Sequence, residues 1–137
     1  PGAAMKTLIA EMNATVEELA ANTQLESIAV NLKNGINSLS TAADWLLANY
    51  DSKPQAAAAG AVPFLKMTGI VVGGWLMARS AAIAVKHMAA GTTDDFYQAK
   101  LATATYFAAH QLPFAAAYAA EITGGSESVF ALPENLF

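Results

Sequence analysis

The sequence predicts an all-α protein: an antiparallel up-down-up-down four-helix bundle with a short C-terminal helical tail. Apolar residues recur at spacings of three and four, which is the period of an amphipathic helix. Clusters of proline, glycine and threonine divide the chain into four long segments. No stretch shows the alternation of apolar and polar residues that is typical of a strand. Because the connections between segments are short, we expect neighbouring helices to run antiparallel in a single domain over residues 1–137.

The first two helices are expected at approximately residues 4–21 and 24–50. Between them, Thr23 and Glu26 have the spacing of a capping box, in which each side chain satisfies a free backbone N–H of the other residue. The second helix is polar on its other faces, so we expect it at the edge of the bundle. Its apolar stripe is the clearest in the chain and consists of Leu25, Ile28, Leu32, Ile36, Leu39, Ala43, Leu46 and Tyr50.

The third helix is expected at approximately residues 54–90. Pro54 suits its first turn, where a backbone N–H has no partner within the helix. Gly60 and Pro63 should kink or break the helix near its start, because proline removes one backbone donor and clashes with the preceding turn. Gly91 should end it.

The fourth helix is expected at approximately residues 94–123 and is apolar nearly all round. Thr92 or Thr93 should cap its start, and Pro113 predicts a kink within it. A glycine pair should end this helix, and a short helix is expected after the pair at approximately residues 127–132.

The stretch 61–81, AVPFLKMTGIVVGGWLMARSA, admits three interpretations: a membrane span, a glycine-rich cofactor loop, or a helix buried on every side. A span needs roughly 17–25 mostly apolar residues, and the uncharged segment between Lys66 and Arg79 is shorter than that. The glycines form neither a G-x-G-x-x-G nor a Walker pattern. The sequence therefore favours a buried helix and no membrane span. The residues expected at its helix–helix contacts are Gly69, Gly73, Gly74 and Trp75.

The composition indicates a domain that packs against something else. Only 13% of the residues are charged, about half of the ~25% that is usual in soluble domains, while 55% are hydrophobic. We therefore expect a neighbouring domain, another subunit or lipid to cover part of the apolar surface. The net charge of −4 argues against a nucleic-acid partner. The absence of cysteine excludes disulfides and fits a cytoplasmic location, and a start at Pro1 indicates a processed product or a fragment.

No catalytic, cofactor-binding or metal-binding constellation is expected. His87 and His110 lie on different predicted helices and lack the spacings that hold a metal in a helical bundle. Arg79 and Lys86 are seven residues apart and share a helix face, so they could contact a phosphate, but an ion pair with an acid such as Glu121 is favoured. The weak ligand or ion-pair candidates are thus Arg79, Lys86, His110 and Glu121.

Several short motifs over residues 61–113 keep a distinctive order and spacing. They are Ala61-Val62-Pro63-Phe64-Leu65, Gly69, Gly73-Gly74-Trp75-Leu76-Met77-Ala78-Arg79, Phe96-Tyr97, Lys100-Leu101-Ala102-Thr103-Ala104 and Leu112-Pro113. In this order they resemble the extra C-terminal helical domain of the large bacterial acyl-CoA dehydrogenases, which act on acyl-CoA and methylthio-propanoyl-CoA thioesters among others. The resemblance covers essentially the whole chain, and it departs at Thr105, where the family pattern has an arginine.

The resemblance implies that FAD, the catalytic glutamate and most of the thioester pocket belong to the dehydrogenase core domains of the same polypeptide. In such enzymes a base takes the α-proton of the acyl-CoA and FAD takes the β-hydride. This chain would bind no cofactor, have no activity alone, and pack on the core in a homo-oligomer.

Two other functions remain open from the sequence. The chain could be a stand-alone helical small-molecule-binding protein or enzyme that uses a cavity near Pro63 and Pro113, with polar contacts from His110, Tyr106 or Glu121. A small membrane-associated protein is the third interpretation.

Overall fold

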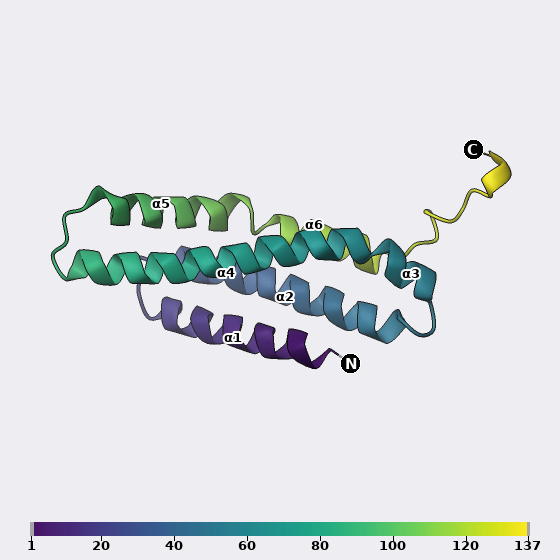
Figure 1. Cartoon of the computed structure of the whole chain (residues 1–137), viewed down its shortest axis with the longest axis horizontal. Coiled ribbons are helices and arrows are strands. Elements are labelled where there is room, and N and C mark those ends of the chain that lie inside the picture. Colours follow the sequence, from purple (N-terminus) through teal and green to yellow (C-terminus); the bar gives the residue numbers. More distant parts are fainter. Residues whose placement is uncertain (1, 137) are drawn as a thin grey trace.

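The computed structural model describes residues 2–136, and in this range it contains helices and turns but no strand (Figure 1). The all-α class is therefore confirmed. The elements are α1 (Ala3–Ala20), α2 (Glu26–Asn49), α3 (Pro54–Ala59), α4 (Ala61–Ala89), α5 (Asp95–His110), α6 (Phe114–Thr123) and a 3-10 turn, η1 (Glu134–Leu136).

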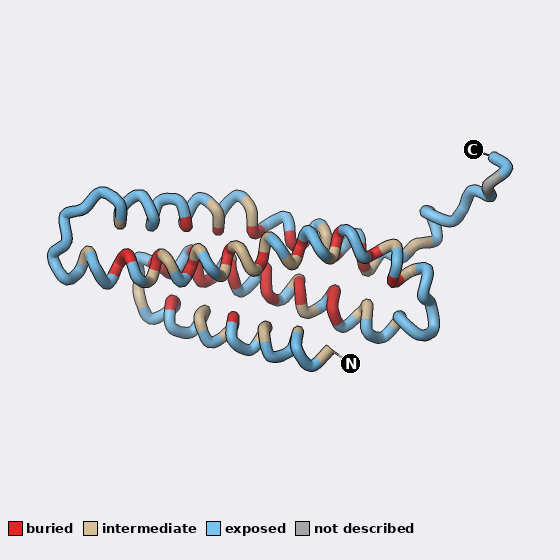
Figure 2. The backbone as a smooth tube through the Cα atoms, in the orientation of Figure 1, coloured by how far each residue is buried: buried red, intermediate tan, exposed pale blue. Residues whose placement is uncertain are grey.

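Helices α2 and α4 form the centre of the molecule. Helix α1 packs along α2, while α5 and α6 follow one another and pack on both α4 and α2. Buried residues gather where these helices face one another, and the outer faces are exposed (Figure 2). The largest fully buried side chains are Met12, Leu19, Ile28, Leu32, Ile36, Leu39, Met67, Val71 and Leu112. Since no polar or charged side chain is buried in the described part of the chain, apolar packing holds the helices together.

Two of the predicted long helices are each divided in the structure. The segment predicted at 54–90 forms α3 and α4, which meet at the buried Gly60. Pro63 lies inside the first turn of α4, where its missing N–H removes no hydrogen bond of that helix. The break expected near Gly60 and Pro63 is therefore confirmed. The segment predicted at 94–123 forms α5 and α6, with Pro113 at the N-cap of α6.

The short helix predicted at 127–132 is wrong. The backbone of these residues forms turns and bends, and η1 follows them. Gly125, with φ of 85°, turns the chain away from the end of α6. A helix as short as the predicted one needs tertiary packing to be stable, and all of residues 127–132 are exposed.

The predicted caps of α2 and α5 are also wrong. Leu25 is the N-cap of α2 and makes no side-chain bond to the helix. Its N–H donates to the Asn22 carbonyl in a tight turn. Asp94 caps α5 by accepting the Phe96 N–H at 2.9 Å. Neither Thr92 nor Thr93 is the N-cap of α5. Thr92 instead belongs to the end of α4, a Schellman motif around Gly91 in which the Thr92 N–H donates to the His87 carbonyl.

Leu112 connects α2 and α4 with the junction of α5 and α6. It lies between α5 and α6, where its N–H donates to the Phe107 carbonyl five residues back and widens the last turn. Its side chain reaches between two glycines on different helices. A Cβ on Gly35 in α2 would lie 3.2 Å from Leu112 Cδ2, and a Cβ on Gly74 in α4 only 2.6 Å from the same atom. Leu112 is 2% exposed, so it has little freedom to move aside.

We expect Gly74→Ala to lower the free energy of unfolding by roughly 1–3 kcal/mol, because the added methyl overpacks the site that Leu112 fills. Gly69→Ala is the matched control on the same helix: nothing lies within 4 Å of its added Cβ, and alanine should stabilise the helix by about 1 kcal/mol. Urea unfolding followed by circular dichroism measures both. Equal effects of the two substitutions would contradict this packing.

Candidate functional site

Helix α4 carries an apolar stripe that faces away from the core. Val62, Gly69, Leu76 and Ile83 are seven residues apart, and Val72 lies between two of them on the same face. Val62, Leu76 and Ile83 are 61%, 51% and 55% exposed, and the space beside Gly69 is open. We call these five residues the outer α4 face.

The prediction that α4 is buried on every side is therefore wrong for the part of the chain that the structure describes. Helices α1, α2, α5 and α6 all pack on α4, and within the described residues the outer α4 face has no such cover. In length and composition α4 could also cross a membrane, but the core helix of a soluble protein passes the same test. The length and composition of α4 are therefore only weak evidence for a membrane span.

The glycines predicted at helix contacts have different surroundings. A Cβ on Gly73 would lie 3.3 Å from the Phe107 ring of α5, and Gly74 accommodates Leu112. Gly69 instead belongs to the outer α4 face, because α4 turns this residue away from α5. Trp75 points to α1, where its Nε1 donates to Thr15 Oγ1 at 2.7 Å.

Basic residues border the outer α4 face, and residues 54–92 contain no acid. The Arg79 guanidinium lies over the Trp75 ring, 5.2 Å from its centroid. Lys86 Nζ contacts Glu18 Oε1 of α1 at 2.9 Å, which is the one ion pair found within residues 2–136. The acid that pairs is thus on α1 and not the predicted Glu121, and both partners are exposed.

The remaining candidate side chains do not converge. His87 stacks on Tyr97, and His110 lies against Tyr106, with ring centroids 4.6 Å apart in each pair. Both histidines and Glu121 are exposed. Over residues 2–136 no group of three or more side chains could hold a metal ion.

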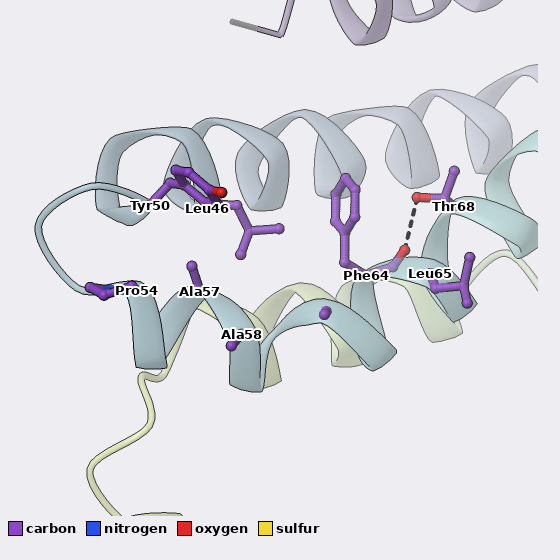
Figure 3. A pocket seen from close by; sticks show the side chains of 9 residues that line it. Leu46, Tyr50, Pro54, Ala57, Ala58, Phe64, Leu65 and Thr68 are labelled. Carbon is purple, nitrogen blue, oxygen red and sulfur yellow. Dashed lines mark hydrogen bonds between the residues drawn. The ribbon is translucent and has the colours of Figure 1, made fainter.

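Two hollows lie near the prolines that suggested a cavity. An open groove of about 530 Å³ separates the end of α2 from α3 and the start of α4 (Figure 3). Its lining is almost entirely apolar, and the Thr68 hydroxyl within it donates to the Phe64 carbonyl at 2.8 Å. A smaller hollow of about 320 Å³ lies beside Pro113. The larger groove, called the α3 groove below, is lined by Leu46, Tyr50, Pro54, Ala57, Ala58, Ala61, Phe64, Leu65 and Thr68.

The cavity expected near Pro63 and Pro113 corresponds to these two hollows, whereas the outer α4 face was not expected from the sequence. The seven-residue spacing of Val62, Gly69, Leu76 and Ile83 was visible in the sequence, but a spacing does not say which side of a helix its neighbours cover. The polar residues suggested for a cavity, His110, Tyr106 and Glu121, line neither hollow.

These features describe an all-helical domain whose central helix, α4, keeps one apolar face exposed. The described residues contain no cluster of metal ligands. Comparison with known proteins gives its family. Residues 8–133 match the family described as "Acetyl-CoA dehydrogenase C-terminal like", and the chain belongs to this family. The family resemblance seen in the sequence is thereby confirmed.

Two curated relatives are acyl-CoA dehydrogenases by name. The 3-methylmercaptopropionyl-CoA dehydrogenase of Ruegeria pomeroyi is 37% identical over 122 residues, which cover 88% of this chain and 21% of that protein. The broad-specificity linear acyl-CoA dehydrogenase FadE5 of Mycobacterium tuberculosis is 46% identical over 57 residues, 39% of this chain and 9% of that protein. The chain thus corresponds to a small part of much longer proteins.

We expect Thr15→Val to lower the free energy of unfolding by about 1 kcal/mol, because the partly buried Trp75 N–H loses its acceptor. Thr7→Val on the same helix is the control, since that hydroxyl bonds to the Ala3 carbonyl of its own helix. Denaturant unfolding of both variants measures the difference. A larger loss for Thr7→Val would contradict a role for the Trp75 bond in holding α1 on α4.

Proposed function

We propose that this chain is the C-terminal structural and assembly domain of a FAD-dependent acyl-CoA dehydrogenase and packs on the catalytic domains through the outer α4 face. The parent enzyme would carry out α,β-dehydrogenation of an acyl-CoA thioester, and this domain would have no activity alone. The observation that carries the proposal is an apolar face, open in the described structure, on the central helix of a chain in this family.

The comparisons support a parent enzyme in which catalysis and this structural domain occupy different parts of the polypeptide. Matched segments make up only 21% and 9% of the two relatives, so most of each relative lies outside the region that this chain resembles. In the parent enzyme FAD and the catalytic residues would lie there. We propose that this chain supplies no catalytic, cofactor or metal ligand, and that Gly69 and the other residues of the outer α4 face form its contact.

The energetics favour a partner on the same polypeptide. Complete burial of an aliphatic side chain contributes roughly 1.5–3 kcal/mol, and Val62, Leu76 and Ile83 are each about half exposed. Covering them would then contribute only a few kcal/mol, which is little against the roughly 4–15 kcal/mol cost of bringing two free proteins together. Covalent linkage removes most of that cost, because the contact becomes intramolecular.

We also propose an architecture for the domain and a setting for the parent protein. We interpret residues 1–137 as one antiparallel up-down-up-down bundle, in which α3 with α4 and α5 with α6 form the third and fourth rods. The parent protein would be cytoplasmic and homo-oligomeric, with no nucleic-acid partner and no membrane span.

A second candidate function is a stand-alone helical protein that binds a small apolar molecule in the α3 groove. The volume and apolar lining of the groove favour it. Its lining offers few polar groups, so it would take a hydrocarbon and not an acid or a phosphate.

The coding sequence upstream of Pro1 tests the first proposal directly. We expect the reading frame to continue through a segment of dehydrogenase size, and the isolated chain to be purified helical and colourless. A start codon immediately before Pro1, or a yellow flavin-bound chain, would contradict the proposal.

In the parent protein we expect Leu76→Glu to lower the unfolding temperature by several degrees, because it places a charge in the buried contact. In the isolated chain the same substitution should leave stability within about 0.5 kcal/mol, since Leu76 is exposed there. Thr41→Glu, at an exposed position of α2, is the control in both proteins. Equal effects of Leu76→Glu in both contexts would count against the outer α4 face as the contact.

A further inference from the structure

A small notch of about 150 Å³ joins the outer α4 face to α5, where these two helices lie side by side (Figure 1). Its walls are mostly apolar. Ile83 of the outer α4 face and Phe96 of α5 both line it, and they are 55% and 56% exposed. The exposed apolar surface therefore continues from α4 onto α5. The α4–α5 notch, as we call it, is lined by Ser80, Ile83, Ala84, Phe96, Tyr97 and Lys100.

Arg79 lies within this apolar surface. It is three residues after Leu76 and four before Ile83, so the three residues are neighbours on one side of α4. The Arg79 guanidinium lies 5.2 Å from the centroid of the Trp75 ring, and the Trp75 N–H donates to Thr15 of α1. Because a hydrogen bond fixes the ring, the ring holds the guanidinium in place on the α1 side of the apolar residues.

Lys100 is the corresponding cation on the α5 side of Ile83. Its Nζ lies 5.2 Å from the centroid of the Phe96 ring, and both residues line the α4–α5 notch. The one ion pair in the described part of the chain includes neither Lys100 nor Arg79, and residues 54–92 contain no acid. Two cations thus flank the apolar surface, and the described residues place no carboxylate within ion-pair distance of either.

Covering the outer α4 face would also take these cations out of water. Arg79 is one helical turn from Leu76 and from Ile83, so a partner that buries those two side chains also shields the guanidinium. A buried charge without an opposite charge is strongly unfavourable. A purely apolar partner therefore fits this surface poorly. A second copy also fits poorly, because a two-fold contact between identical faces would bring like charges together.

We propose that the outer α4 face and the α4–α5 notch bind an acidic surface of the catalytic domains of the parent enzyme. This surface places an apolar side chain in the notch and carboxylates against Arg79 and Lys100, and these ion pairs fix the orientation of the domain on the core. The two relatives extend far beyond their matched segments, which are 21% and 9% of their lengths, so a parent of that kind has ample chain to supply it. The inference rests on the proposed function, since it names the chemistry of the same contact.

Charge reversal in the parent protein tests the proposal. We expect Arg79→Glu and Lys100→Glu, made singly, to lower the unfolding temperature of the parent by several degrees more than that of the isolated chain, because each brings like charges together in the contact. The difference should shrink in ~1 M NaCl, which screens charges beyond about 3 Å. Lys53→Glu is the matched control, with the same change of charge at an exposed position outside this surface. Calorimetry of each variant in both proteins measures the shifts.

The proposal is overturned if the parent loses no more than the isolated chain, if Lys53→Glu has the same effect, or if salt leaves the loss unchanged. Leu76→Glu separates this failure from that of the proposed function. If Leu76→Glu destabilises the parent and the charge reversals do not, the outer α4 face is buried against a partner without carboxylates, and only the acidic surface is refuted. If none of the three substitutions destabilises the parent more than the isolated chain, the contact through the outer α4 face is refuted as well.

Discussion

The fold depends on the contact of Leu112 with two glycines. The missing side chains of Gly35 and Gly74 leave a recess between α2 and α4 that the leucine fills from the junction of α5 and α6. Glycine within a helix costs about 1 kcal/mol relative to alanine, so the contact must offset two such losses through close packing. Because the leucine lies between α5 and α6 and contacts both α2 and α4, it sets how deeply the second half of the chain lies against the first.

This arrangement leaves α4 with two dissimilar sides. The inner side packs through small and medium residues such as Ala78, Ala81 and Val71, all fully buried. The outer side keeps Leu76 and Ile83 half exposed, and no acidic residue occurs along α3 and α4 to raise its polarity. A helix with apolar residues on both sides suits a position between two bodies.

Helix periodicity predicted most of the secondary structure, since apolar spacing reports directly which stretches form amphipathic helices. It did not predict the caps at Leu25 and Asp94, because side chains near a helix start compete for the same few N–H groups and the turn geometry decides among them. The sequence placed Gly73 and Gly74 at helix contacts, but it could not separate them from the exposed Gly69. Gly69 and Gly73 have the same local pattern, yet Phe107 packs beside only one of them. Such differences arise from tertiary neighbours.

The central claim is that the outer α4 face is buried in a longer parent protein and open in this chain. Because the chain has no cysteine, a single Leu76→Cys substitution gives one thiol, whose rate of reaction with a maleimide reports exposure. Thr41→Cys on α2 is the matched exposed control. We expect fast labelling of both thiols in the isolated chain and, in the parent protein, strong protection of the thiol at position 76 alone. Equal labelling rates at position 76 in the two proteins would contradict it.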